Sequence, residues 1–371
     1  MQALLRALSP GLLSLRQAVP GLAVAVALSL LARLLADRIG EGIAGGPALP
    51  LSPVLIAVLL GMLWRNTLGV PGWSVEGLNW AMHGVLRTGI ALIGLRLTLS
   101  GVGAIAATAL PVVIGCITVA LVASLVVVRL FGVPRRLAGL LAVGTAVCGC
   151  TAVIAVSPAI RAQNVETAFA VTCVVLFGCI AMLFYPWVAA MVFDGSPVYA
   201  GVFLGTAIHD TSQVIGAALI HSQQVDSPEA LAAASVTKLF RNLSIILIVP
   251  AAAWLASRRP NGQGGEGEPS PRTRAVPFFV IGFILFVVLR TAGDALTQGS
   301  AAASTWESMI SLGSGLSELL LICGMTAVGL NVSFAQMGRI GWRPLAAGLL
   351  TAVAVGACSL YLTLLVQRFA G

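Results

Sequence analysis

The chain has 371 residues, of which 58% are hydrophobic and only 9% are charged. Soluble domains carry roughly 25% charged residues, so this composition excludes a soluble protein and predicts an all-α polytopic membrane protein. The net charge of +8 comes from basic residues spread among loops rather than gathered on one face, a pattern that excludes nucleic-acid binding. We therefore expect the lipid bilayer, and no nucleic acid, as a partner.

The seven cysteines all lie in apolar stretches, which argues against a disulfide framework. Cys148 and Cys150 are close in sequence, but no neighbouring His or Cys completes a tetrahedral metal site. No arrangement of nucleophile, base and acid is visible either. We expect neither a metal nor another cofactor, and we expect that the protein is not an enzyme.

Apolar stretches of roughly 15–25 residues follow a short N-terminal segment, 1–18. A Gly- and Glu-rich linker, 257–275, divides them into a group of about eight in 19–256 and a group of about three in 276–371. About eleven transmembrane helices are predicted. The stretches are 19–36, 51–65, 80–100, 107–130, 137–158, 166–192, 198–220, 231–256, 276–293, 307–332 and 343–367.

Basic residues are concentrated in alternate connections, which predicts the orientation of a membrane protein. The pattern places the N-terminus and Arg135 in the cytoplasm, and Asp226 and the C-terminus outside. Two features depart from it. Arg38 and Arg161 fall in outer connections, and the inner connection 194–197 has no basic residue.

Two polar breaks that resemble each other interrupt the apolar stretches. The first reads Gly-Thr-Ala-Val-Cys-Gly-Cys-Thr from Gly144, and the second reads Gly-Thr-Ala-Ile-His-Asp-Thr-Ser from Gly205, 61 positions later. Broken helices at membrane depth line cavities or expose their ends to a transported solute, so the breaks predict a carrier. Because they are two stretches apart, we expect them to run in the same direction, and they could form an inverted pair only if the count of stretches between them is wrong.

A second internal similarity relates residues 89–99 to residues 324–334. These copies lie in the stretches 80–100 and 307–332, which cross the membrane in opposite directions by the count above. Opposite directions are what an inverted repeat requires.

The first break predicts part of a substrate site at Thr145, Cys148, Gly149, Cys150 and Thr151. Small side chains leave backbone N–H groups free, and the N-terminus of a helix half carries a partial positive charge that suits an anion. The alternative is that these small residues only allow close helix packing.

The second break predicts coupling groups and further substrate ligands. Asp210 suits a proton or Na⁺, and His209 has a side chain that titrates near neutral pH. Ser212 and Gln213 continue the polar run and are expected to contact the substrate. The alternative is an ion pair of Asp210 with a basic residue that only holds helices together.

Lys238, Arg241 and Asn242 share one helix face and are suited to binding an oxyanion. The alternative is that the two cations extend to the membrane interface. Glu318, in the stretch 307–332, is a further candidate for coupling. Since basic groups outnumber acidic ones in the apolar stretches, an anionic substrate is favoured over a cationic one.

These motifs together, with the segment from Thr237 to Asn242 and the late Gly329-Leu330-Asn331, resemble the YeiH-like family of bacterial inner-membrane proteins, which carries the label sulfate exporter. That family is similar in turn to the superfamily of bile-acid/sodium symporters and cation–proton antiporters. The resemblance implies two inverted five-helix repeats, discontinuous crossing helices, a core domain that moves against a panel, and a location in the bacterial inner membrane.

The predicted function is secondary active transport of a small anion, sulfate or a related sulfur oxyanion or sulfonate. Export would proceed by alternating access, with coupling through His209 and Asp210. The alternative is a Na⁺- or H⁺-coupled carboxylate symporter or a cation–proton antiporter. The sequence leaves open whether H⁺ or Na⁺ is the coupling ion and whether the protein is a homodimer.

Overall fold

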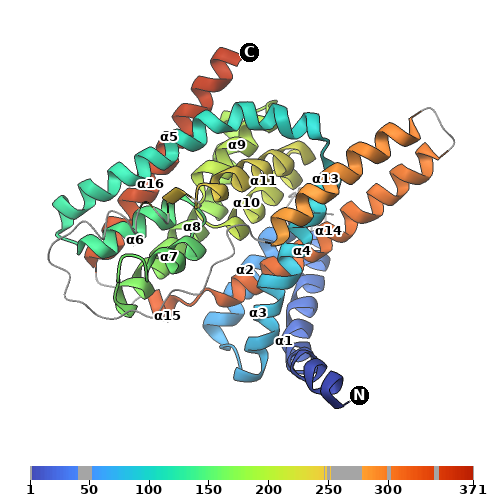
Figure 1. Ribbon diagram of the computed structural model, residues 1–371, viewed down its shortest axis with the longest axis horizontal. Helices are drawn as coiled ribbons and strands as arrows, with labels where there is room; N and C mark the ends of the chain where they lie inside the picture. The colour runs from blue at the N-terminus through green and yellow to red at the C-terminus, as the bar shows by residue number, and fades with distance from the viewer. Residues whose placement is uncertain are drawn as a thin grey trace. The chain divides into compact units, whose positions relative to one another are not determined.

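A computed structural model describes residues 2–40, 52–245, 247–248, 251, 278–298, 302–337 and 342–370. These residues contain helices and no strand, which confirms an all-helical protein (Figure 1). The chain divides into two compact units: unit 1 comprises Met1–Thr98 and Gly282–Phe334, and unit 2 comprises Leu99–Ile281 and Ala335–Gly371. The linker predicted at 257–275 lies outside the described residues.

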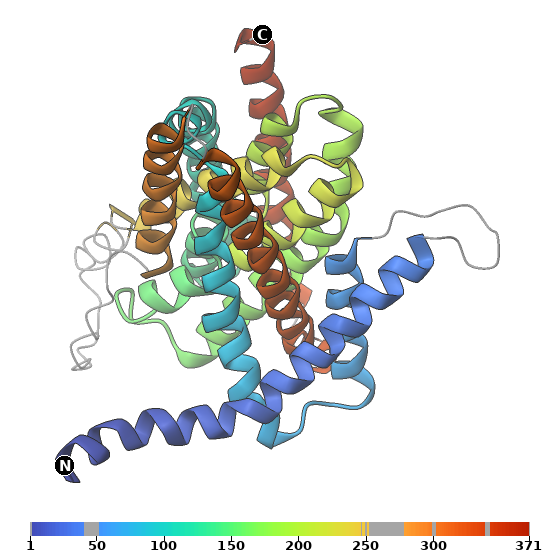
Figure 2. The ribbon, with the colours of Figure 1, turned by 90° about the vertical axis from the view of Figure 1, so that its right-hand side faces the viewer.

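Unit 1 is built on α14, against which α2 and α4 pack, while α1 runs along α2 and α3 (Figure 2). The chain between α3 and α14 includes a π-helical turn and a 3₁₀ turn that flank α4. The elements are α1 (Gln2–Gly40), α2 (Pro53–Thr67), η2 (Gly72–Ser74), α3 (Val75–Trp80), η3 (Ala81–Val85), α4 (Leu86–Leu92), η4 (Ile93–Arg96), α13 (Phe278–Thr297) and α14 (Ala303–Asn331).

The similarity between 89–99 and 324–334 corresponds to a reciprocal contact between α4 and α14. A methyl group built on Gly89 would lie 3.0 Å from the Leu321 side chain, and one on Gly324 would lie 2.8 Å from Leu86 Cδ1. Leu86 and Leu321 are related by the same offset of 235 positions as the two glycines. Leu86 contacts Gly324, whereas the later residue Gly89 contacts the earlier residue Leu321. The two copies are therefore antiparallel.

Both copies also end in the same way. The helical segment of the first copy ends at Arg96, Leu97 is extended, and the next helix begins at Leu99. In the second copy α14 ends at Asn331, followed by extended Val332 and by α15 (Phe334–Met337). The sequence similarity therefore marks two equivalent helix ends.

Unit 2 contains two helical hairpins that flank α8, together with a long helix, α5, that packs along α16. Its elements are α5 (Leu99–Phe131), α6 (Arg135–Ala146), α7 (Cys150–Val156), α8 (Asn164–Val192), α9 (Pro197–Ala207), α10 (Thr211–Gln224), α11 (Pro228–Leu243) and α16 (Trp342–Ala370).

The first hairpin is formed by α6 and α7, which lie side by side (Figure 1). A methyl group built on Gly144 would lie 2.7 Å from Val153 Cγ2, and one on Gly139 would lie 3.9 Å from Ile160 Cδ1. In one continuous helix, residues 139 and 160 would be about 31 Å apart. The chain therefore reverses direction at the first polar break, where Gly149 adopts a φ of +67°.

The second hairpin is formed by α9 and α10. The ring of Phe203 in α9 lies 5.4 Å from that of Tyr185, and His221 Nδ1 at the end of α10 lies 3.2 Å from the carbonyl oxygen of Pro186. Both helices of the hairpin thus lie beside the same turn of α8. The chain reverses at the second polar break as well.

The two hairpins lie along α8 in opposite directions. The base of the first is bonded to Thr167 and its tip contacts Val174. The tip of the second is bonded to Val175, and its base lies next to Pro186. The expected discontinuous helices that cross the whole membrane, and the expected common direction of the two breaks, are therefore wrong. Each break is a reversal, and the single helix α8 between them inverts the second hairpin.

The hairpins are equivalent in detail. The helices of the first end at Ala146 and resume at Cys150, and those of the second end at Ala207 and resume at Thr211, a constant offset of 61. The hydroxyls of Thr145 and Thr206 each donate to the carbonyl four residues earlier, over 2.7 Å. The offsets of 61 and 235 differ, and the two inverted five-helix repeats that the resemblance implied are not confirmed.

Six helices in the described residues are long and apolar enough to cross a membrane, within α1, α5, α8, α13, α14 and α16, and α2 and α9 are shorter apolar helices. A multi-pass helical membrane protein is thus supported, whereas the eleven predicted spans are not confirmed. Two of those eleven, 137–158 and 198–220, are the hairpins.

Candidate functional site at the hairpin tips

Lys238 of α11 is fully buried where the two hairpin tips meet. Its ammonium donates to the carbonyl oxygens of Val147 and Ile208, each over 3.1 Å, and to that of His209. The three acceptors match the three N–H donors of the group. One lysine therefore binds the backbone of both tips at once.

Arg241, one helical turn further along α11, is also fully buried and binds both tips. Its Nε donates to the carbonyl of Ala146 over 2.7 Å, and Nη2 donates to that of Thr145. Its Nη1 donates to the carbonyls of Thr206 and Ile208. The guanidinium thus connects the ends of α6 and α9.

These carbonyls belong to the C-terminal ends of α6 and α9, where helices leave unpaired acceptors and a partial negative charge. Two cations at this place satisfy the acceptors and neutralise the charge. The alternative that Lys238 and Arg241 extend to the membrane interface is wrong, since neither side chain is exposed. Their predicted role as substrate ligands stays a prediction, and in this conformation their donors are directed to the backbone.

Asp210 caps the N-terminus of α10. Its Oδ1 accepts from the backbone N–H of Ser212 over 2.9 Å and from the Ser212 hydroxyl. Its Oδ2 faces the other tip, because a methyl group built on Gly149 would lie 2.9 Å from it. The carboxylate therefore lies between the two tips. No residue pairs with it in an ion pair within the described part of the chain, so the alternative of a structural ion pair is not supported.

Among the described residues, several buried polar atoms around the second tip have no hydrogen-bond partner. They are both ring nitrogens of His209, the hydroxyl of Thr237 and the amide oxygen of Asn242. The other end of the Asn242 amide donates to the hydroxyl of Thr211 over 3.2 Å. Buried polar groups are almost always paired, so these atoms mark hydrogen-bonding capacity that a ligand, an ion or water would satisfy.

Other residues predicted for the site have different surroundings. Gln213 is buried and its Nε2 donates to the Val175 carbonyl over 3.1 Å and to Cys179 Sγ over 3.3 Å, so it anchors α10 to α8. Cys148 is buried at the first tip, Cys150 is half-buried and Thr151 is exposed.

The last predicted residue, Glu318, belongs to α14 of unit 1, where its charge acts on that of Arg96. Its coupling role stays a prediction. Within the described residues no group of three or more His, Cys, Asp and Glu side chains is arranged to hold a metal ion.

Two further contributors were not among the predicted site residues. Thr211 bonds Asn242, and its place in the polar run from His209 to Gln213 was the available signal. Gly178 of α8 leaves room for Gln213, since a methyl group on it would overlap the Gln213 amide. A lone glycine in an apolar helix gives no signal of that kind.

Two opposed hairpins that meet beside buried cations, in a chain of long apolar helices, define a polytopic helical membrane protein. Residues 20–348 match the family described as conserved hypothetical protein 698, and the chain belongs to this family. It is similar to a UPF0324 membrane protein of Ralstonia nicotianae, 35% identical over 80% of this chain and 81% of the relative. It is also similar to UPF0324 membrane proteins of Bacillus cereus, 28% identical over 90% of both chains, and of Pseudomonas putida, 31% identical over 87% of this chain and 88% of the relative.

Proposed function

We propose that this protein is a secondary carrier of a small anion, sulfate or a related sulfur oxyanion or sulfonate, and that the substrate binds where the hairpin tips meet. The observation that carries the proposal is the convergence of two opposed hairpins on Lys238 and Arg241. Irregular backbone at membrane depth is tolerated where it lines a cavity, and transporters use helix ends of this kind to bind solutes.

The charges at the tips favour an anion. The hairpin tips hold two buried cations and one carboxylate. The helix ends that point toward the site carry partial charges of both signs. The unpartnered polar atoms of His209, Thr237 and Asn242 add groups that could bond an oxyanion or its water. Thr211 and Ser212 supply hydroxyls at the start of α10.

Asp210 is the proposed coupling residue. Its carboxylate occupies the N-terminus of α10, the position that an anion would otherwise take. A proton on Asp210 removes that negative charge and weakens its hold on the Ser212 N–H. Proton binding and anion binding would therefore favour each other, and His209, buried beside it, would assist the transfer.

The hairpins also support the orientation proposed from the sequence. A hairpin begins and ends on the same side of the membrane, so Arg161 joins Arg135 on the cytoplasmic side and the 194–197 connection moves outside. These two departures from the charge pattern then disappear, and Arg38 alone remains in an outer connection. A bacterial inner-membrane location, a cytoplasmic N-terminus and outward transport by alternating access are part of this proposal.

A second candidate, a Na⁺-coupled carboxylate symporter or a cation–proton antiporter, is favoured by one observation. The unpaired amide oxygen of Asn242 lies near the N-terminal end of α10, which the carboxylate of Asp210 caps. Oxygen atoms of this kind bind Na⁺. In that case Asp210 would bind the cation directly.

The test combines binding and transport. Purified protein is heated with sulfate, sulfite, thiosulfate, sulfonates, bicarbonate and carboxylates, with and without Na⁺, at two pH values, and stabilising anions are then used in counterflow assays in proteoliposomes. We expect anion stabilisation that strengthens at the lower pH. Asp210→Asn should keep anion binding and lose its pH dependence, whereas Asp226→Asn, the same change at an exposed turn, should behave like wild type.

Stabilisation by Na⁺ alone, lost in Asp210→Asn, would instead establish the second candidate. A wild-type protein that responds to none of the anions would refute the first.

A further inference from the structure

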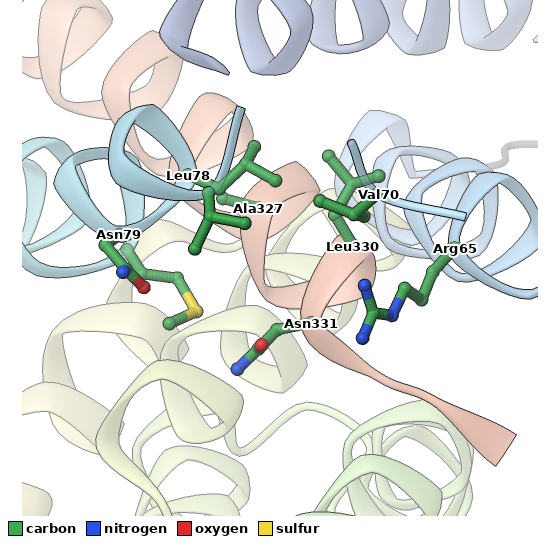
Figure 3. A pocket seen from close by; sticks show the side chains of 9 residues that line it. Arg65, Val70, Leu78, Asn79, Ala327, Leu330 and Asn331 are labelled. Carbon is green, nitrogen blue, oxygen red and sulfur yellow. The ribbon is translucent and has the colours of Figure 1, made fainter. Parts of the chain in front are cut away.

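A cavity lies in unit 1, built from α2, α3, η3, α14 and the loop after α2. Its volume is about 110 Å³, enough for a small polyatomic ion. Three polar side chains line it, those of Arg65, Asn79 and Asn331. Figure 3 shows the guanidinium of Arg65 directed toward Asn331, whose amide points to the other side. The remaining wall is apolar and includes Leu78 and Leu330.

Arg65 is half-buried, and among the described residues no ion pair or hydrogen bond engages its guanidinium. The ion pairs of unit 1 that the structure describes are made by Arg290, with Asp294 and Glu307. A guanidinium held in a cavity presents several N–H donors whose geometry matches phosphate or carboxylate oxygens. The available donors of Arg65 therefore point to an anionic ligand.

The two asparagines distinguish the kind of anion. Asn79 and Asn331 supply amide groups from α3 and α14, while Arg65 comes from a third helix, α2. Such an arrangement fits a tetrahedral oxyanion better than a planar carboxylate. The apolar wall formed by Leu78 and Leu330 would accommodate the carbon atoms of an esterified phosphate.

We propose that this cavity binds a phosphate group, either as a free ion or as the headgroup of an anionic phospholipid, with Arg65 as its principal ligand and Asn79 and Asn331 as additional donors. The two sources share the same chemistry at the cavity. This site uses none of the residues at the hairpin tips, so it does not depend on the proposed transport function.

The test follows thermal unfolding of the purified full-length protein in detergent, titrated separately with inorganic phosphate, with phosphatidylglycerol and with phosphatidylcholine. We expect phosphate or phosphatidylglycerol to stabilise the wild type, and the apparent affinity to fall about tenfold or more in Arg65→Ala. Arg33→Ala removes the same charge from an exposed position of unit 1 and should respond like wild type. Because Arg65→Ala leaves the hairpin tips unchanged, loss of the response in this variant separates this site from the tips.

A response to phosphatidylglycerol alone assigns the cavity to a lipid headgroup, and a response to inorganic phosphate assigns it to a free ion. If Arg65→Ala aggregates, Arg65→Gln and Asn331→Leu are titrated in its place. The proposal is overturned if neither probe stabilises the wild type, or if the folded Arg65 and Asn331 variants retain the wild-type response.

Discussion

Asp210 and Gly149 lie in contact at the point where the two hairpin tips meet. A methyl group on Gly149 would lie 2.9 Å from Asp210 Oδ2 and 3.0 Å from Asp210 Cβ. The two residues are also equivalent, because the offset of 61 that relates the hairpins takes position 149 to position 210. At equivalent positions of the two tips, one hairpin therefore has a carboxylate and the other has the space that the carboxylate needs.

We expect Gly149→Ala to destabilise the protein by more than the conformational cost alone. With a φ of +67° and a ψ of −129°, Gly149 lies outside the left-handed helical region, and an L side chain there costs about 1–3 kcal/mol before the contact with Asp210 is added. Gly132→Ala is the control for a positive φ alone, since Gly132 has a φ of +59° with nothing within 4 Å of the added methyl group. Thermal unfolding of both variants measures the difference. Equal losses would show that the tips do not approach each other as described.

Lys238 gives a test that separates a structural role from a substrate-binding role. Replacing it with Met leaves three buried carbonyls without donors, and we expect a loss of about 3 kcal/mol or more in the absence of any ligand. Arg135→Ala, which removes an exposed cation from the start of α6, should have little effect. If Lys238→Met has wild-type stability but no longer responds to anions, Lys238 is a substrate ligand and its bonds to the carbonyls are not important for folding.

The polar breaks could be located from the sequence because small and charged residues are costly in an apolar stretch. That each break reverses the chain could not be predicted. The stretch 137–158 is as long as a membrane span, and its composition is compatible with a continuous helix and with a hairpin. The only signals were Arg161 and the uncharged connection 194–197, which departed from the charge pattern.

The residues of the candidate site could be predicted from the sequence, but their partners could not. Lys238 and Arg241 were recognised as a face with two cations, but their partners are main-chain carbonyls of two other segments. Carbonyl groups are present at every residue, so no sequence pattern marks the ones that accept these bonds. By contrast, the similarity of 89–99 and 324–334 corresponds to a contact between two helices in the structure. This contact could be predicted because it depends on glycines, which the sequence shows directly.

Asn66 provides a prediction for unit 1. Its amide donates to the Val332 carbonyl over 2.9 Å, and its Oδ1 accepts from the Phe334 N–H over 2.8 Å, so it replaces the helical bonds lost after α14 ends. We expect Asn66→Ala to cost about 1–3 kcal/mol in thermal unfolding and to speed amide exchange at Phe334. Thr67→Ala removes a hydroxyl whose one bond to the described residues lies within its own helix, to Leu63, and should change neither. Unchanged exchange at Phe334 in Asn66→Ala would exclude this role.

The reversal of the first hairpin is the feature on which the site depends most, and it can be measured directly. In a background without the native cysteines, spin labels at positions 139 and 160 should report a short distance, because Gly139 and Ile160 lie in contact. A continuous helix would separate these positions by about 31 Å. Labels at the exposed residues Val165 and Trp187 of α8 give the control, since they are on one helix and should be about 33 Å apart. A distance between positions 139 and 160 that is close to this control value would restore the membrane-spanning helix and remove the opposed tips.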